Sequence, residues 1–479
     1  MASPGSPPAP ARPAALLSGV AAVLLASLAC VGPGDPQADI PTAGTLLITG
    51  GTVITMDAKD SIIENGAVVV VEGRIAAIGP AAELDRAYPN ARRVDAAGKI
   101  VMPGLINAHT HVPMVLFRGL ADDLVLMEWL DEHIFPAEAR LVDEEFVRWG
   151  TRLACMEMLR GGITTFVDMY YFEDVVAQEA ERCGMRAVVG ETLIDFPAPD
   201  NTTWDEAVTY SREFVETWRG HSRITPAIAP HAPYTVSGDH LVEAHALATE
   251  LDVPLLIHLA EDRAELETIS QLSGMTSVDY LDSLGVLDDR VLAAHVVWPT
   301  QSEIELLAER GVGVAHCPQS NMKIAAGVAP APAMIEAGVA LGLGTDGAAS
   351  NNDLNLWEEI DTAAKLHKVT TGDPTVIDAR EALRMATIEG ARALGMESEI
   401  GSLEVGKRAD LIVVGTGGLH QRPSYSPYSL LTYTTKASDV ETVIVEGRIV
   451  VDAQQITTLD SAEVLERVEG YRRQMATDG

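Results

Sequence analysis

The central part of the chain, residues 103–395, alternates short apolar runs with stretches in which apolar positions recur every three or four residues. The first pattern is typical of buried strands and the second of amphipathic helices. The apolar runs lie at residues 104–111, 162–168, 186–193, 224–231, 254–258, 291–295, 311–316 and 339–346. Helical patterns between them include residues 143–160 and 300–310. Eight such alternations over roughly 290 residues predict an α/β fold, a TIM-like (β/α)8 barrel over residues 103–399.

Strand patterns of a different kind flank this central region. Between residues 45 and 102, short β-rich runs are separated by turn residues, among them Gly50-Gly51 and Glu72-Gly73. The pattern returns between residues 400 and 455, with Glu446-Gly447 between two apolar runs. Such two-residue turns are a strong hairpin signal. We predict that the flanking segments form the two halves of one small β-sandwich, and that residues 456–479 add a C-terminal helix.

The first 44 residues have a separate character. Residues 14–29 are an unbroken apolar and small run, short for a membrane span and typical of a signal-peptide core. The run ends Ser27-Leu28-Ala29-Cys30, which suits ordinary signal cleavage or a bacterial lipoprotein site. We predict a signal peptide over residues 1–30, a linker over 31–44, and export to the periplasm or cell envelope. Lipidation of Cys30 stays open, because Ser27 replaces the usual Leu. A non-signal extension, and hence a cytoplasmic protein, is the alternative.

The composition excludes one class of partner. The chain has 34 Lys and Arg against 69 Asp and Glu, a formal net charge of -35. Such a chain repels nucleic acid and anionic lipid, so we expect a small-molecule substrate, with membrane contact only through a lipid on Cys30. The four cysteines include no CxxC pair and no disulfide framework.

Histidine and aspartate gather where the predicted strands end. They are His109, His111, His231, His258, His295, His316 and Asp346. Active sites of such barrels lie at the carboxyl ends of the strands, and random placement of 12 histidines rarely gives this pattern. A lone histidine of this kind is usually a core or rim residue, but the joint pattern predicts a metal site.

Four of these side chains form a suitable ligand set: His109, His111, His258 and Asp346. The two histidines of the first strand are two residues apart, so their side chains point to the same face. Three imidazole nitrogens and one carboxylate oxygen suit one Zn²⁺ per subunit, or less often Fe²⁺ or Mn²⁺. Such a cation lowers the pKa of a water, and Asp346 can take the proton.

Two further residues are placed for proton transfer. Glu261 follows His258 by three residues, so a short turn would carry its carboxyl over the metal to protonate a substrate ring nitrogen. His295 ends the next strand and can orient the attacking water or polarise the bond under attack. The alternatives are a helix N-terminal carboxylate for Glu261 and a packing residue for His295.

Six segments carry a resemblance that covers roughly residues 45–470. They are residues 103–111 (PGLINAHTH), 230–234 (PHAPY), 258–261 (HLAE), 294–295 (AH), 316–323 (HCPQSNMK) and 344–352 (GTDGAASNN). They resemble the amidohydrolase superfamily, and within it the branch of 5-methylthioadenosine/S-adenosylhomocysteine deaminases and triazine chlorohydrolases.

The resemblance implies a metal-dependent aminohydrolase that acts on cyclic amidines. Metal hydroxide would attack the amine-bearing ring carbon of an adenine nucleoside: 5-methylthioadenosine, S-adenosylhomocysteine, adenosine or 5'-deoxyadenosine. Glu261 would protonate the ring nitrogen, and Asp346 would deliver the proton with which ammonia leaves. The resemblance also implies that Glu128-Trp129 holds the ribose hydroxyls, that His231 contacts the nucleoside, and that the enzyme is a homo-oligomer. From the residues alone, 126–130 is equally an amphipathic helix with an exposed Glu128.

One departure bears on the substrate. Some relatives grip the homocysteine carboxylate with arginines on and after the third strand. Here Arg186 is retained, but Glu191 follows it and no second basic residue does, so we expect the carboxylate of S-adenosylhomocysteine to be repelled.

Two other functions remain open. One is a further amidohydrolase activity of the same branch, as a guanine- or pterin-type deaminase or a triazine chlorohydrolase. The other is a non-catalytic metal-binding surface protein. Glu261 together with His295 favours deamination, because a binding protein needs no proton shuttle.

Overall fold

The computed structural model describes residues 44–478. The predicted signal peptide, Cys30 and all but the last residue of the predicted linker lie outside this range, so the predictions made for them stay predictions. Within residues 44–478, none of the helices combines the length and the apolar character that crossing a bilayer requires.

Eight parallel strands at the centre of the fold follow one another in sequence order around the sheet. They are β6 (Leu105–Thr110), β7 (Ile163–Tyr170), β8 (Arg186–Leu193), β9 (Ile224–Pro230), β10 (Leu255–Leu259), β11 (Val291–His295), β12 (Gly313–His316) and β13 (Ala340–Leu343). The last strand returns to the first, where Asn107 Nδ2 donates to Thr345 Oγ1 over 2.8 Å and Thr345 N donates to Asn107 Oδ1 over 2.9 Å. The predicted barrel is confirmed.

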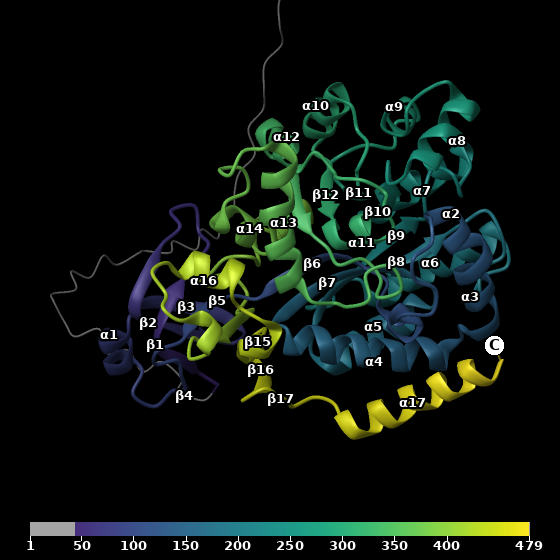
Figure 1. Ribbon diagram of the computed structural model, residues 1–479. Coiled ribbons are helices and arrows are strands. Elements are labelled where there is room, and N and C mark those ends of the chain that lie inside the picture. The colour runs from purple at the N-terminus through teal and green to yellow at the C-terminus, as the bar shows by residue number, and fades with distance from the viewer. Residues whose placement is uncertain (1–43, 479) are drawn as a thin grey trace, which may run out of the picture. The chain divides into compact units, whose positions relative to one another are not determined.

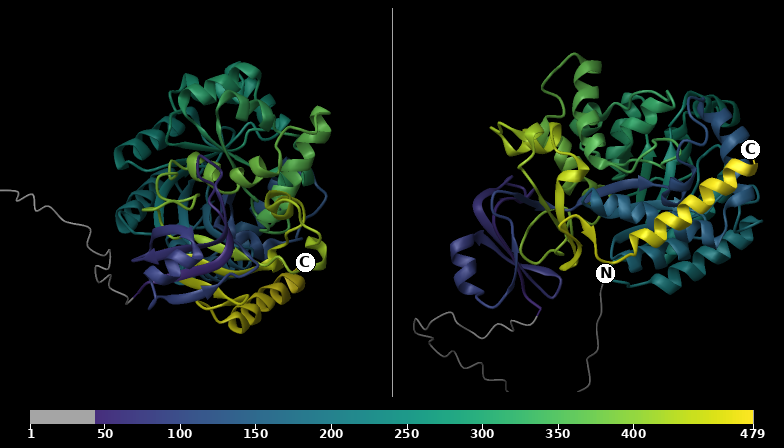
Figure 2. Two further views of the ribbon diagram at one scale, coloured as in Figure 1. Left: turned by 90° about the vertical axis from the view of Figure 1, so that its left-hand side faces the viewer. Right: turned by 60° about the horizontal axis from the view of Figure 1, so that its bottom comes forward.

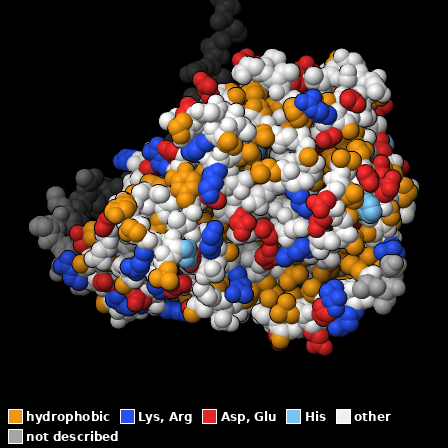
Figure 3. All heavy atoms as spheres, viewed as in Figure 1, with side chains coloured by type: hydrophobic (Ala, Val, Ile, Leu, Met, Phe, Trp, Pro, Cys, Tyr) orange, Lys and Arg blue, Asp and Glu red, His pale blue; other side chains and the backbone are white. Residues whose placement is uncertain are grey.

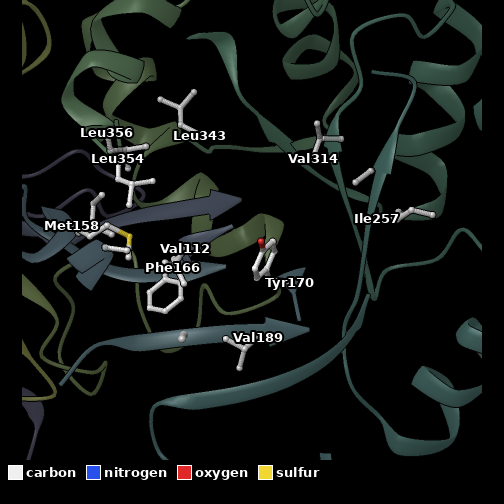
Figure 4. Close-up of a cluster of buried hydrophobic side chains, with 14 of the residues drawn as sticks. Val112, Met158, Phe166, Tyr170, Val189, Ile257, Val314, Leu343, Leu354 and Leu356 are labelled. Carbon is white, nitrogen blue, oxygen red and sulfur yellow. The ribbon is translucent and has the colours of Figure 1, made fainter. Parts of the chain in front are cut away.

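Strand side chains alternate between the barrel interior and the layer beneath the helices, as the two-residue period of a strand dictates. Val167 and Met169 of β7 pack inside the barrel with Leu256 of β10. Their sequence neighbours Phe166 and Ile257 belong instead to the larger core outside the strands, part of which Figure 4 shows. Both faces are therefore buried, which explains why the strands read as continuous apolar runs.

Helices surround the barrel strands (Figures 1 and 2). Two correspond to predicted helices and begin after residues whose side chains accept a backbone N–H, Asp143 before α4 (Glu144–Arg160) and Thr300 before α10 (Gln301–Arg310). The others are α5 (Glu173–Cys183), α6 (Trp204–Trp218), α7 (Gly238–Leu251), α8 (Arg263–Ser273), α9 (Ser277–Ser283), α11 (Pro318–Lys323), α12 (Ala331–Ala337), α13 (Leu356–Thr371), α14 (Ala379–Met385) and α15 (Ile388–Ala393).

A run of short helices follows β6 and precedes α4. It comprises the 3-10 helix η1 (Val112–Phe117), α2 (Leu126–Glu128), the π-helical η2 (Trp129–Ile134) and α3 (Phe135–Leu141). Because this run leaves the carboxyl end of a barrel strand, it lies at the end of the barrel where active sites are built.

The two flanking segments meet in one nine-stranded mixed sheet. Its strands are β1 (Leu46–Ile54), β2 (Ile62–Val71), β3 (Arg74–Pro80), β4 (Arg92–Asp95), β5 (Ile100–Pro103), β14 (Leu411–Val414), β15 (Val440–Val445), β16 (Arg448–Asp452) and β17 (Gln455–Ile456). β5 pairs antiparallel with β14, which joins the segment before the barrel to the segment after it. Ile48, Val68 and Leu411 share one apolar cluster, so both halves build one core, as predicted.

The turns of this sheet include one difference from expectation. Both predicted Glu-Gly hairpins form, with positive φ at each residue of Glu72-Gly73 and Glu446-Gly447, as a type I′ turn requires. Gly50-Gly51 does not separate two strands, because β1 runs through it with register shifts on either side of Gly51. The φ of +88° at Gly50 makes a bulge there, which bends a strand without ending it.

The remaining elements are helices outside the group that surrounds the barrel. They are α1 (Ala81–Ala87), η3 (Leu419–Gln421), α16 (Pro427–Tyr433), η4 (Ala437–Asp439) and α17 (Ser461–Asp478). The predicted C-terminal helix is α17, which lies along α4 with Val464 against Trp149 and Met156 (Figure 1). Acidic and basic side chains are interspersed over the face shown in Figure 3. The domain boundaries themselves stay predictions.

Candidate metal centre and active site

The four predicted metal ligands meet at the carboxyl ends of their strands. His109 and His111 come from the end of β6, His258 from β10, and Asp346 from the residues after β13. His111 Nε2 lies 3.3 Å from His258 Nε2 and 3.3 Å from Asp346 Oδ1, and His109 Nε2 lies 3.5 Å from the same oxygen. His111 and His258, which are 147 positions apart in sequence, are thus brought to one point.

The hydrogen bonds of the imidazoles indicate what belongs between them. His111 Nδ1 lies 2.6 Å from the carbonyl of Met169, and His258 Nδ1 lies 2.8 Å from that of His231. A carbonyl only accepts, so each Nδ1 carries the proton and each Nε2 presents a lone pair. Two lone pairs 3.3 Å apart repel unless a cation lies between them. Ligand atoms of a tetrahedral zinc are separated by about 3.4 Å, so the spacing fits.

Two further observations support a divalent metal at this point. His109 Nε2 is buried and makes no hydrogen bond with any other residue of 44–478. Burial lowers the pKa of His109 to about 4, and burial together with the adjacent imidazoles lowers that of His258 well below its usual range. Neutral imidazoles are the form that binds metal. The residues present therefore fit a divalent transition metal.

Asp346 is held in a strained and closely defined position. Its φ is +64°, a left-handed conformation that an aspartate adopts at a cost. Ser320 and Ser350 donate to Oδ2 over 2.6 and 2.8 Å, while Gly347 N donates to Oδ1 over 2.6 Å. Burial raises the pKa of this carboxyl, but the imidazoles of His109 and His295 outweigh it and lower the pKa well below its usual range. The sequence analysis did not predict a role for the two serines, although both lie in segments that carry the family resemblance.

Glu261 faces the histidines and does not cap a helix. The N-cap of α8 is the next residue, Asp262, whose side chain accepts from Ala264 N. Glu265 fixes the turn by accepting from Glu261 N over 2.9 Å. Burial, and then the charge of Asp346, raise the pKa of Glu261 well above its usual range. A carboxyl in this state keeps its proton and can donate it.

His295 lies beside Glu261. Its Nε2 is 3.6 Å from Glu261 Oε1, and its φ of +73° is again left-handed. Its Nδ1 lies 2.9 Å from Asn321 Oδ1; because an amide oxygen accepts, Nδ1 carries the proton and Nε2 offers a lone pair. The roles predicted for both residues stay predictions, but the geometry brings them to the metal ligands.

A cavity of about 600 Å³ opens beside this cluster. The strand ends contribute polar side chains, among them His231, whose pKa burial lowers to about 3. The α2–α3 run contributes apolar ones, including Trp129, Leu130 and Phe135. An apolar cavity with a few convergent polar groups is the usual form of a small-molecule site.

The two residues of the predicted Glu128-Trp129 pair lie in different environments. Trp129 is buried and lines the cavity, but Glu128 is exposed and is not among the lining residues. The acid in the α2–α3 wall is instead Glu138, whose Oε1 accepts from Tyr170 Oη over 2.7 Å. Burial raises the pKa of Glu138 to about 8, an effect that the tyrosine hydroxyl partly opposes. The one sequence feature that could have indicated Glu138 is its place next to Ala137 and four residues after Ile134, on the apolar side of the helical run.

Three other residues lie away from the cavity lining. His316 Nε2 lies 3.0 Å from His367 Nε2, so this strand-end histidine pairs within the core. Arg186 is at the amino end of β8, bound to Asp410 over 2.8 Å, and Glu191 accepts from Asn201 over 3.1 Å. Arg186 and Glu191 therefore do not contact a substrate carboxylate in the cavity. The prediction that Glu191 repels the carboxylate of S-adenosylhomocysteine is corrected.

Comparison with known proteins agrees with this architecture. The model of the amidohydrolase family matches residues 100–450, and that of the imidazolonepropionase-like composite domain of bacteria matches residues 66–91. The chain belongs to the amidohydrolase family. The enzyme is therefore a hydrolase of a metal-dependent family.

Individual relatives narrow the position of this amidohydrolase within the family. It is 49% identical over 428 residues to a 5-methylthioadenosine/S-adenosylhomocysteine deaminase of Syntrophobacter fumaroxidans, covering 89% of this chain and 98% of the relative. An adenosine deaminase of Xanthomonas campestris with bound zinc has a TM-score of 0.89 and 42% identity, over 90% of this chain and 98% of its own. An atrazine chlorohydrolase of Arthrobacter aurescens complexed with zinc has a TM-score of 0.83 and 26% identity, over 89% and 99%. The resemblance inferred from sequence is confirmed.

Proposed function

We propose that this amidohydrolase is a zinc-dependent hydrolytic deaminase of adenine nucleosides. In the reaction a C–O bond forms at the ring carbon that bears the amine, the C–N bond breaks, one water is consumed and ammonia is released. The name of a relative that is 49% identical, and the 42% identity to the adenosine deaminase, support this proposal over the chlorohydrolase at 26% identity. Both solved structures contain zinc, which supports the metal.

The observation that carries the proposal is a pair of carboxyl groups beside the histidine cluster whose pKa values are shifted in opposite directions. The pKa of Glu261 is raised by burial, whereas that of Asp346 is lowered by its imidazole neighbours. Two carboxyls whose pKa values are pushed apart serve as an acid and a base at the same pH. Deamination of a purine needs both, since a ring nitrogen gains a proton while the attacking water loses one.

The steps can be assigned to residues of this chain. His109, His111, His258 and Asp346 would hold the zinc, which would supply Lewis-acid activation of a water. The Asp346 carboxylate accepts the proton of the attacking water and returns it to the leaving amine. The Glu261 carboxyl gives its proton to the ring nitrogen next to the carbon under attack, and it regains one from the added hydroxyl when the carbonyl forms. His295 orients the water through the lone pair on Nε2.

The rest of the cavity binds the nucleoside. Trp129 covers one side of the ring system, and the His231 imidazole contacts the purine. We assign the ribose hydroxyls to Glu138, because it is buried in the cavity wall while Glu128 is exposed. This contact replaces the one inferred from sequence for Glu128.

The test follows ammonia release by the zinc-loaded full chain. Substrates are 5-methylthioadenosine, S-adenosylhomocysteine, adenosine, 5'-deoxyadenosine, guanine and a chlorotriazine. We expect release from at least one adenine nucleoside, abolished by Asp346→Asn and retained by Asp289→Asn, which alters an exposed aspartate at the opposite end of the barrel. Turnover of guanine or the chlorotriazine alone, or of none of them with zinc bound, would contradict the proposal.

We also propose that residues 1–30 direct export and that the enzyme is a homo-oligomer. The apolar run before Cys30 supports the first proposal, and the family resemblance supports the second. Fractionation of producing cells, with the mass of the mature chain, tests cleavage and lipidation. Light scattering on the purified protein tests the oligomer, and a monomer would contradict it.

A further inference from the structure

A second hollow lies next to the active-site cavity and shares part of its wall. Leu130, Phe135 and Tyr234 line both spaces. The outer hollow continues past them along Phe196 and Leu272. These two side chains are 39% and 65% exposed, unusually high for large apolar groups, so the hollow offers uncovered apolar surface directly outside the cavity.

The orientation of a bound nucleoside directs one part of it toward this hollow. The amine-bearing carbon must meet Glu261 and Asp346 at the strand ends, which leaves the sugar toward the α2–α3 run. Glu138 belongs to that run and is assigned to the ribose hydroxyls. The group on the 5' carbon is then the part farthest from the metal ligands, and the shared wall of Leu130 and Phe135 is the surface that it reaches.

The charges along this path are of one sign. The described residues that line the two spaces include no Lys and no Arg. The outer hollow carries two aspartates, Asp131 and Asp195. Asp195 is partly compensated, because it lies 2.6 Å from His240 Nδ1 and accepts from Ser237 N over 2.8 Å. Asp131 is exposed and has no ion pair with the rest of the described chain.

We propose that the outer hollow receives the 5' substituent and selects uncharged or cationic groups against carboxylates. This inference rests on the proposed deaminase function and deepens it. A methylthio group covers Phe135 and Phe196, whose ring centroids are 5.3 Å apart, and needs no polar partner. The carboxylate of S-adenosylhomocysteine finds no cation there and faces Asp131 instead. The amine on the same side chain is tolerated.

The decisive experiment compares substrates that differ by one group. S-adenosylhomocysteine and its decarboxylated analogue share the thioether and the amine, but the analogue lacks the carboxylate. We expect kcat/KM for the analogue and for 5-methylthioadenosine to exceed that for S-adenosylhomocysteine by about tenfold, because the carboxylate meets a like charge and no cation in a hollow that is open to solvent. Equal kcat/KM values for the three substrates would overturn the inference.

A pair of variants assigns the effect to the hollow. Asp131→Lys supplies the missing cation, so we expect the ratio of S-adenosylhomocysteine to 5-methylthioadenosine turnover to rise about tenfold or more. Asp205→Asn removes an exposed acid of α6 outside both spaces and should leave the ratio unchanged. An unchanged ratio in Asp131→Lys would contradict the assignment. Failure of every adenine nucleoside would instead reject the deaminase function itself, so the two failures are distinguishable.

Discussion

The two ends of the barrel differ in whether their buried polar groups have partners within the protein. At the amino end, Arg186 donates to Asp410 over 2.8 Å and to the Ser222 carbonyl over 2.7 Å, and Glu446 N donates to Asp410 over 2.7 Å. At the carboxyl end, His109 Nε2 is buried without a hydrogen-bond partner in the described chain. Buried charges at the first end are paired within the protein, whereas at the second end a buried imidazole nitrogen has no partner in the described chain.

The backbone shows the same difference. His295 and Asp346, at the carboxyl ends of their strands, both have positive φ, which costs folding free energy. Arg186 begins β8 with regular pairing to β7 and β9. The amino end therefore fastens the accessory sheet to the barrel, and the carboxyl end keeps side chains in positions that chemistry requires. We therefore expect substitutions at the amino end to lower mainly stability, and substitutions at the carboxyl end to lower mainly activity.

The largest expected effect is on activity at the carboxyl end. Glu261→Gln keeps the shape of the side chain but removes the proton that it donates, so we expect kcat to fall about 10²–10⁴-fold. The melting temperature of the metal-free protein should change little, because no buried charge is lost. Steady-state ammonia release measures the first quantity and thermal denaturation the second. Glu267→Gln, an exposed position on α8, is the matched control. A fall in kcat of less than threefold would remove Glu261 from the mechanism.

At the amino end we expect the reverse. Arg186→Met leaves Asp410 buried and unpaired, which should lower the free energy of unfolding by about 3–5 kcal/mol. Activity per folded molecule should be unchanged, since Arg186 is outside the cavity lining. Urea unfolding gives the first value. Arg212→Met breaks the exposed pair with Glu250 and should lower the free energy of unfolding far less, because solvent screens that pair. If both variants lower the free energy of unfolding by the same amount, the buried Arg186–Asp410 pair does not hold the accessory sheet to the barrel.

The smallest effect concerns Glu138, a buried acid of the active-site wall that has no cationic partner among residues 44–478. Its pKa rises from an ordinary 4.5 to about 8 on burial. Between these values the unfolded chain releases a proton that the folded protein keeps, so the free energy of unfolding falls as pH rises. Glu138→Gln removes this dependence and should gain roughly 2–4 kcal/mol over the wild type near pH 8, with a smaller gain near pH 5.5.

Urea unfolding of both metal-free proteins at the two pH values measures this gain. Glu132→Gln, at an exposed position of η2, should show no pH-dependent difference from the wild type. A gain for Glu138→Gln that is equal at both pH values would mean that Glu138 is ionised in the folded protein.

Much of the fold could be predicted because its signals are local. Each barrel strand is buried on both faces, so it reads as an apolar run, and residues such as Asp143 and Thr300 mark where helices begin. The error at Gly50-Gly51 has a local cause as well, because the same glycines suit a turn and a bulge. Which of the two forms depends on the partner strand β2, whose register is absent from the local pattern.

Some residues of the candidate site could likewise be predicted from local sequence, and others could not. Its histidines, Glu261 and Asp346 could be named from sequence because strands that run parallel end at one rim, so their final residues converge whatever the details of packing. Glu138, Ser320 and Ser350 could not, because their roles depend on which way a helix or loop turns its side chains. Glu128 and Glu138 are both acids of one short run, and only the packing of α2, η2 and α3 buries one and exposes the other.

By itself the sequence predicted the barrel, the accessory sheet, the candidate ligand set and the candidate proton-transfer pair, since periodicity and strand ends are properties of the chain. Only the tertiary structure decided the directions in which the pKa values of Glu261 and Asp346 shift, because burial and neighbouring charges set a pKa. It also decided that Arg186 belongs to the amino end. The direction of a strand carries its first and last residues to opposite ends of the barrel, and a charge at one end does not act on a substrate at the other.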